Sequence, residues 1–149
     1  MLRVTKLADY GIVILTYLAA HRENTYNARD IATLVNLPLP VVSKVLKLLG
    51  KSGLVVSQRG IKGGYGLARS PQEITVAAII GAVEGPIAVT EGNTTRDCDM
   101  QTGCPVRTNW HLINRTIQSA LERISLAEMT RPMAQPLVNL TVPGSVSGN

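Results

Sequence analysis

The chain has 149 residues, of which 45% are hydrophobic and 17% charged, and it contains no phenylalanine. This length fits one ordinary domain with a helical arm and excludes two large domains. The hydrophobic share can bury an aliphatic core, which excludes disorder of the whole chain. The longest apolar run, within residues 12–20, is shorter than the ~20 residues of a membrane span. With no secretory signal at the start either, we expect a cytoplasmic protein without a membrane helix.

The net charge of +5 is distributed unevenly along the chain. Residues 1–70 carry ten Lys and Arg against three acids, a net of +7, whereas the remainder carries five basic residues against seven acids, a net of −2. Between Asp30 and Glu73 there are six basic residues and no acid. Such a stretch is typical of a module that binds a polyanion, although a solvated basic face would have the same composition.

Helices are predicted over most of the first 53 residues. Apolar residues at helical spacing predict a first helix from Leu7 to about residue 20. Asn27 is suited to cap a short second helix that ends near Asn36, and Pro40 to lie in the first turn of a third helix that ends at Gly53. Two short helices joined by a tight turn are typical of a helix-turn-helix.

The third of these helices has an apolar face and a basic face. Lys44, Lys47 and Lys51 lie at positions i, i+3 and i+7 of one face, with Ser43 beside them. A recognition helix, which points its N-terminus into the major groove of DNA, begins with small or hydroxyl residues and carries basic ones. The third helix is therefore the predicted recognition helix.

The periodicity then changes to that of strands. Residues 54–59 are rich in β-branched side chains, residues 60–64 form a glycine-rich turn, and residues 65–68 return as a second strand. A hairpin flanked by Arg59 and Lys62 is typical of a wing that reaches a minor groove. The alternative is the phosphate-binding loop of a nucleotide enzyme. That loop needs a following helix and a Gly-Lys-Ser/Thr sequence, and both are absent from the pattern here.

The C-terminal half predicts a dimerisation arm. Thr75 caps a short apolar helix over 76–83, a polar loop follows, and Pro105 begins a long helix. Its apolar residues are spaced as in a coiled-coil seam, and we expect a two-fold dimer, the alternative being that the helix covers its own domain. The expected dimer interface consists of Trp110, Ile113, Ile117, Leu121 and Ile124. A capping box at Ser125 predicts one more short helix.

The chain has two cysteines, Cys98 and Cys104, with five residues between them. Two thiolates can ligate an iron–sulfur cluster or zinc, or form a reversible disulfide, but two alone do not complete a tetrahedral site. They are equally compatible with incidental thiols. A small thiol redox enzyme would need one thiol of depressed pKa, for which the sequence offers no base. A module that only binds proteins would leave the basic stretch unexplained.

Four motifs together resemble the IscR/NsrR group of bacterial winged helix repressors, in detail the branch that regulates the SUF iron–sulfur assembly operon. They lie at residues 6–11, 37–44, 59–65 and 98–105. The resemblance implies a homodimer that binds palindromic promoter DNA, with residues of the third helix at the major groove, Arg59 in the minor groove, and Lys6 and Lys62 near phosphates. With Lys47 of the basic face and two turn glycines, the expected DNA-binding residues are Lys6, Pro40, Val41, Ser43, Lys44, Lys47, Arg59, Gly60, Lys62 and Gly63.

The resemblance also implies an iron–sulfur cluster, 2Fe-2S or 4Fe-4S, that senses cluster status, nitric oxide or oxidants. Its ligands would be Cys98, Cys104 and, donated by the partner subunit, Asp9. A third cysteine common in the family falls at Gly92 here, and a histidine used by some relatives falls at Arg107. The alternatives are a labile cluster, a lost cluster, or an unusual fourth ligand. The candidates for that ligand are Glu91, Asp97 and His111.

These patterns predict a mainly α fold with a small β-hairpin wing. We expect a winged helix-turn-helix DNA-binding domain at 1–85, an effector loop at 86–104, a dimerisation helix at 105–131 and a disordered tail at 132–149. The expected function is a homodimeric repressor of iron–sulfur assembly genes that responds to cluster or redox status. The alternatives are a winged helix regulator without a cluster, switched by oxidation of Cys98 and Cys104, and a small thiol redox enzyme.

Overall fold

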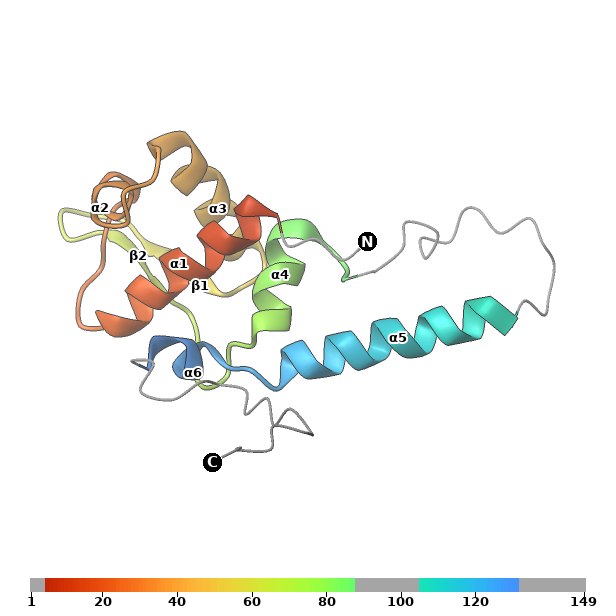
Figure 1. Cartoon of the computed structure of the whole chain (residues 1–149). Helices are drawn as coiled ribbons and strands as arrows, with labels where there is room; N and C mark the ends of the chain where they lie inside the picture. The colour runs from red at the N-terminus through yellow and green to blue at the C-terminus, as the bar shows by residue number, and fades with distance from the viewer. Residues whose placement is uncertain (1–4, 88–104, 132–149) are drawn as a thin grey trace, which may run out of the picture.

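The computed structural model describes residues 5–87 and 105–131 (Figure 1). The predicted fold class is confirmed, because the described residues are mainly helical with one two-stranded antiparallel hairpin. The elements in chain order are α1 (Lys6–Ala20), α2 (Ala28–Leu34), α3 (Leu39–Lys51), β1 (Val55–Gln58), β2 (Gly64–Leu67), α4 (Val76–Glu84), α5 (Pro105–Glu122) and α6 (Leu126–Thr130).

The predicted helix caps are present. The Asn27 side chain accepts a hydrogen bond from the Asp30 N–H at 2.8 Å, and Thr75 Oγ1 accepts one from a backbone N–H at 3.1 Å. Ser125 forms a reciprocal capping box with Glu128, whose carboxylate accepts from the Ser125 N–H at 2.7 Å. Each cap satisfies an N–H that has no partner within its helix, and so determines where the helix begins.

The turn between α2 and α3 depends on residues that tolerate unusual backbone angles. Asn36 has a φ of 55°, in the left-handed region that asparagine enters more readily than most residues. Pro40 lies in the first turn of α3, as predicted, and Gly53 follows α3 with a φ of 75°. The tight turn and the glycine at position 53 thus define where α3 begins and ends.

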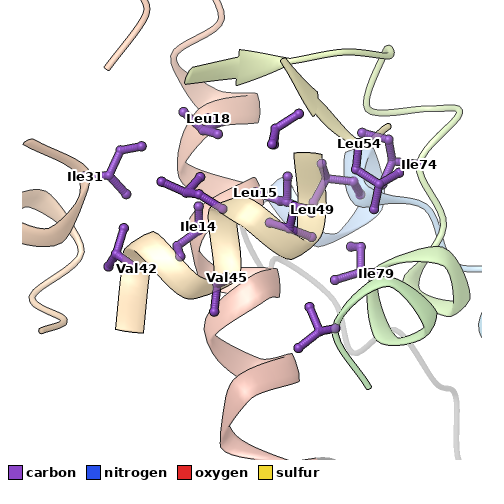
Figure 2. Packing of buried hydrophobic residues seen from close by; sticks show 14 of the residues in the cluster. Ile14, Leu15, Leu18, Ile31, Val42, Val45, Leu49, Leu54, Ile74 and Ile79 are labelled. Carbon is purple, nitrogen blue, oxygen red and sulfur yellow. The ribbon is translucent and has the colours of Figure 1, made fainter. Parts of the chain in front are cut away.

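The core is aliphatic, as the composition predicted, and it is built around α1 and α3 (Figure 2). Side chains of α2, β1, α4 and α6 complete it. Leu126 reaches this core from the far end of the chain, and its N–H donates to the Ile74 carbonyl at 2.7 Å. The largest fully buried side chains are Ile14, Leu15, Leu18, Ile31, Leu46, Leu49, Ile74, Ile79, Leu126, Val42 and Val45.

A second, smaller cluster joins the arm to the domain. Ala8 of α1 and Val76 and Ile80 of α4 are buried there, and Leu121 and Ile124 pack against them. The last two positions of the predicted dimer seam therefore contact the chain's own core. The N-terminal part of α5 extends away from the domain (Figure 1).

In the described ranges, no single helix is long and apolar enough to cross a membrane. The pair α2 and α3 would suffice in length and composition only when counted together, and the two are bent by 117° at their junction.

We predict that Leu126→Ala lowers the free energy of unfolding by about 2–5 kcal/mol, because it leaves a cavity in the core that α6 closes. Leu112→Ala is the matched control, since Leu112 on α5 is 64% exposed and its truncation changes stability by less than about 1 kcal/mol. Urea denaturation followed by circular dichroism measures both. Equal midpoints for the two variants would contradict the assignment of α6 to the core.

Candidate nucleic-acid interface

The structure separates the two faces of α3. Val42, Val45, Leu46 and Leu49 are buried, and Val41 is half-buried. The opposite face consists of exposed residues, namely Pro40, Ser43, Lys44, Lys47 and Lys51. The core thus holds α3 by its apolar stripe and leaves its small, hydroxyl and basic side chains to solvent.

The hairpin after α3 forms the predicted wing. β1 and β2 pair antiparallel, from Val55 opposite Leu67 to Gln58 opposite Gly64. Its turn is closed by a hydrogen bond from the Gly63 N–H to the Gly60 carbonyl at 2.9 Å. Gly60 has a φ of 123°, which favours glycine. Arg59, Ile61 and Lys62 are exposed at this turn.

The wing is tied to the loop between α1 and α2. Tyr65 donates its N–H to the Tyr26 carbonyl at 2.7 Å, and Tyr26 donates its N–H to the Tyr65 carbonyl at 3.2 Å. Thr25 Oγ1 donates to the Lys62 carbonyl at 2.8 Å. A Cβ atom at Gly64 would lie 2.6 Å from the Tyr26 carbonyl carbon, so only glycine permits this approach.

An aromatic cluster holds this loop against α1. The rings of Tyr17 and His21 stack with centroids 4.3 Å apart, and Tyr26 meets Tyr17 edge-on at 5.5 Å. His21 Nδ1 also forms a hydrogen bond of 2.9 Å with the Tyr17 carbonyl. Desolvation, and secondarily the Tyr26 phenol, raises the pKa of Tyr17 above its ordinary value. The base of the wing is thereby attached to α1.

A groove runs between α3 and the wing. Ser43 and Lys47 contribute to it from α3, and Ser57 and Tyr65 from the two strands. The full lining is Ser43, Leu46, Lys47, Gly50, Val55, Val56, Ser57 and Tyr65. The structure therefore brings the recognition helix and the hairpin, which were predicted separately, into one continuous surface.

The predicted cations of this surface are available to an external anion. Lys44, Lys47, Arg59 and Lys62 are exposed, and none of them forms an ion pair with a carboxylate of residues 5–87 or 105–131. Within the described residues, these cations of α3 and of the wing turn give the surface that they share a positive potential.

Two predicted residues lie elsewhere, at the start of α1. Lys6 is the first residue of α1 and is exposed, and Asp9 is exposed in its first turn. The Thr5 N–H and hydroxyl both donate to the Glu84 carboxylate, the former at 2.8 Å, which links the start of α1 to the end of α4. Neither Lys6 nor Asp9 is part of the groove between α3 and the wing.

Most of the predicted cluster ligands lie outside the part of the chain that the structure describes. Cys98 and Cys104 lie outside the described ranges, as do Glu91, Gly92 and Asp97. Arg107 belongs to α5, and His111 is exposed on the same helix. In residues 5–87 and 105–131, no three His, Cys, Asp or Glu side chains are arranged to hold a metal. The described residues alone therefore do not fit a cluster.

The predicted dimer seam divides into two parts. Trp110 and Ile113 are 36% and 41% exposed, which is high for large apolar side chains on a helix. Ile117 is half-buried, and Leu121 and Ile124 pack on the chain's own second cluster.

Sequence patterns did not indicate the residues that orient the wing. Thr25, Tyr26 and Tyr65 act through backbone pairing between distant segments, which leaves no periodic signal. The adjacent glycines 63 and 64 were the available sign, because consecutive glycines in a strand often mark a close backbone approach.

Comparison with known proteins agrees with this geometry. The model of the Rrf2 family, described as an iron-dependent transcriptional regulator, matches residues 4–132. The HTH-type transcriptional regulator IscR of Aliivibrio salmonicida is 31% identical over 129 residues, which cover 86% of this chain and 77% of the relative.

Two solved structures extend the similarity to the fold. IscR of T. potens has a TM-score of 0.67 and 31% identity, over 86% of this chain and 85% of that one. CymR (YrzC), the global cysteine regulator of B. subtilis, has a TM-score of 0.70 and 30% identity, over 87% and 97%. These relatives confirm the resemblance to IscR-type regulators, and the thiol redox enzyme considered from the sequence does not fit them. The chain belongs to the Rrf2 family of winged helix transcriptional regulators, which bind DNA.

Proposed function

We propose that the chain is a homodimeric repressor that binds palindromic duplex DNA, with α3 in the major groove of each half-site and the wing in the adjacent minor groove. The observation that carries this proposal is the groove shared by α3 and the wing, which Lys47 lines, together with the exposed cations Lys44 on α3 and Arg59 and Lys62 at the wing turn. A duplex presents phosphates along both edges of its grooves, so one backbone strand lying along this groove would meet Lys47, and a phosphate beyond it could reach Lys62 at the wing turn.

The dimensions of the two elements support this docking. An α-helix with its side chains is about 10–12 Å wide and fits a major groove about 12 Å wide. The minor groove is about 6 Å wide and admits only a narrow element. The wing turn carries glycine at two of its four positions 60–63, and the absence of side chains there reduces its width.

The dimer would use the N-terminal part of α5. Trp110, Ile113 and Ile117 present apolar surface that the chain's own described residues leave partly uncovered. A two-fold pairing of this surface is self-complementary and relates two copies of α3. Two recognition helices about 34–36 Å apart would then read the halves of a palindrome on one side of the duplex. We place this activity in the cytoplasm, with promoters of iron–sulfur assembly genes as targets.

The proposed effector segment is residues 86–104. Cys98 and Cys104 offer two soft thiolates, and Asp9 of the partner subunit offers a carboxylate, which together suit iron but number one fewer than four ligands. The description of the family as iron-dependent supports an iron–sulfur cluster of the 2Fe-2S or 4Fe-4S type. A bound cluster would supply a redox-sensitive charge at this segment. The incomplete ligand set favours, as the second candidate, a thiol pair that switches by forming a disulfide.

The ionic character of binding is tested by salt dependence. For wild type, we predict a steep negative slope of log affinity for duplex DNA against log salt concentration. Lys47→Gln reduces the magnitude of this slope by about 1, because one phosphate contact is lost. Arg115→Gln, at an exposed cation on α5, is the matched control and leaves the slope unchanged. Equal slopes for all three proteins, measured by fluorescence anisotropy, would place the DNA elsewhere.

The attachment of the wing is tested by a pair of glycine substitutions. Gly64→Ala forces the wing away from Tyr26, and we predict about ten-fold weaker DNA binding and a loss of about 2 kcal/mol of stability. Gly81→Ala in α4 meets nothing within 4 Å, and we predict unchanged DNA affinity with about 0.5–1 kcal/mol of added stability. Gly64→Ala with wild-type affinity would show that the wing position does not matter for binding.

The cofactor is tested on protein purified without oxygen. We predict visible absorption bands and bound iron that disappear in Cys98→Ala and Cys104→Ala, whereas Thr102→Ala, between the two cysteines, retains both. A colourless, iron-free wild type would contradict the cluster. The second candidate then predicts a loss of 2 Da on oxidation, from a Cys98–Cys104 disulfide, together with changed DNA affinity.

A further inference from the structure

The tip of the wing carries an apolar side chain, Ile61, that has no role in the DNA binding proposed above. Ile61 is 107% exposed, whereas the other exposed large apolar side chains of the described residues reach at most 64%. It belongs to neither hydrophobic cluster. Its neighbours at the turn are two cations, Arg59 and Lys62, and two glycines. Folding of the described residues therefore gains nothing from an isoleucine at this position.

The backbone on both sides of Ile61 is fixed by hydrogen bonds. The turn is closed between Gly60 and Gly63 at 2.9 Å, and the Lys62 carbonyl accepts from Thr25 Oγ1. A Cβ atom at Gly63 would lie 2.3 Å from the Gln58 carbonyl oxygen, so the turn is packed closely on its own strand. A side chain on a turn tied in this way is presented at a defined place, and little backbone entropy is lost when it contacts a partner.

We propose that Ile61 is a DNA-contact residue that inserts into the minor groove as an apolar wedge between Arg59 and Lys62. This inference rests on the proposed function of the wing. Arg59 is drawn into the negative potential of the minor groove, and Lys62 is drawn to the phosphates that flank the groove on either side. Between those phosphates lie deoxyribose rings and base edges, against which apolar side chains of minor-groove proteins pack. Ile61 thus adds a contribution to affinity that does not depend on salt.

The test compares three substitutions on a palindromic duplex of about 40 base pairs that the wild-type protein selects from a randomised pool. Affinities are measured by fluorescence anisotropy from about 50 to about 300 mM NaCl. Ile61→Asn, polar and of similar size, weakens binding about ten-fold at every salt concentration, with a slope parallel to that of wild type. Ile61→Leu binds within about two-fold of wild type, because it remains apolar. Lys62→Gln, in contrast, lowers the magnitude of the slope by about 1.

Each remaining outcome decides against the proposal. Ile61→Asn binding within two-fold of wild type would overturn the wedge, and so would a changed salt slope or a lowered melting temperature, either of which would indicate a rearranged wing. If the wild-type protein binds the duplex and the Ile61 variants bind it with the same affinity, the wedge alone is refuted. Failure of the wild-type protein to select or bind any duplex would refute the proposed function, and the wedge with it.

Discussion

The paired backbone hydrogen bonds between Tyr26 and Tyr65 orient the wing within the proposed DNA-binding surface. A hairpin of two four-residue strands is marginal by itself in water. The pairing with Tyr26 gives it a third, short partner from a different part of the chain. Gly64 permits the approach, and the aromatic cluster with Tyr17 and His21 attaches the same loop to α1. The wing is thus oriented by contacts at its base, while its tip remains exposed.

The first helix connects the wing to the recognition helix. Its C-terminal end carries Tyr17 and His21, while Ile14 and Leu15 on the same helix pack in the core with Val45 and Leu49 of α3. The arm joins this assembly too, because Leu121 of α5 packs against the second cluster, which contains Ala8 of α1 together with Val76 and Ile80 of α4. The helix α1 therefore contacts both elements of the proposed DNA-binding surface and the cluster on which the arm packs.

Local rules predicted much of this structure from the sequence. Asn27, Thr75 and Ser125 cap helices as predicted, because capping depends only on residues within one turn. The division of α3 into a core face and a basic face follows from helical periodicity alone. The glycine-rich hairpin could be predicted from the sequence in the same way, because the residues that favour its turn lie close together in the chain.

Contacts between segments far apart in the chain could not be predicted by such local rules. Nothing near Tyr26 indicates that it pairs with Tyr65, and nothing near Leu126 indicates that it returns to the core beside Ile74. The exposure of Ile61 was also found only in the structure, since an isoleucine in this glycine-rich turn could equally have been buried. The ligand set around Cys98 and Cys104 stays a prediction, as these residues lie outside the described ranges.

In the proposed function, one surface made of α3 and the wing contacts the DNA. All five lysines of the chain lie between residues 6 and 62, so acetylation rates measured by mass spectrometry with and without saturating duplex test it directly. We predict that acetylation of Lys44, Lys47 and Lys62 slows several-fold when the duplex is bound. Unchanged rates at these three lysines, under conditions where anisotropy shows the duplex to be bound, would contradict it.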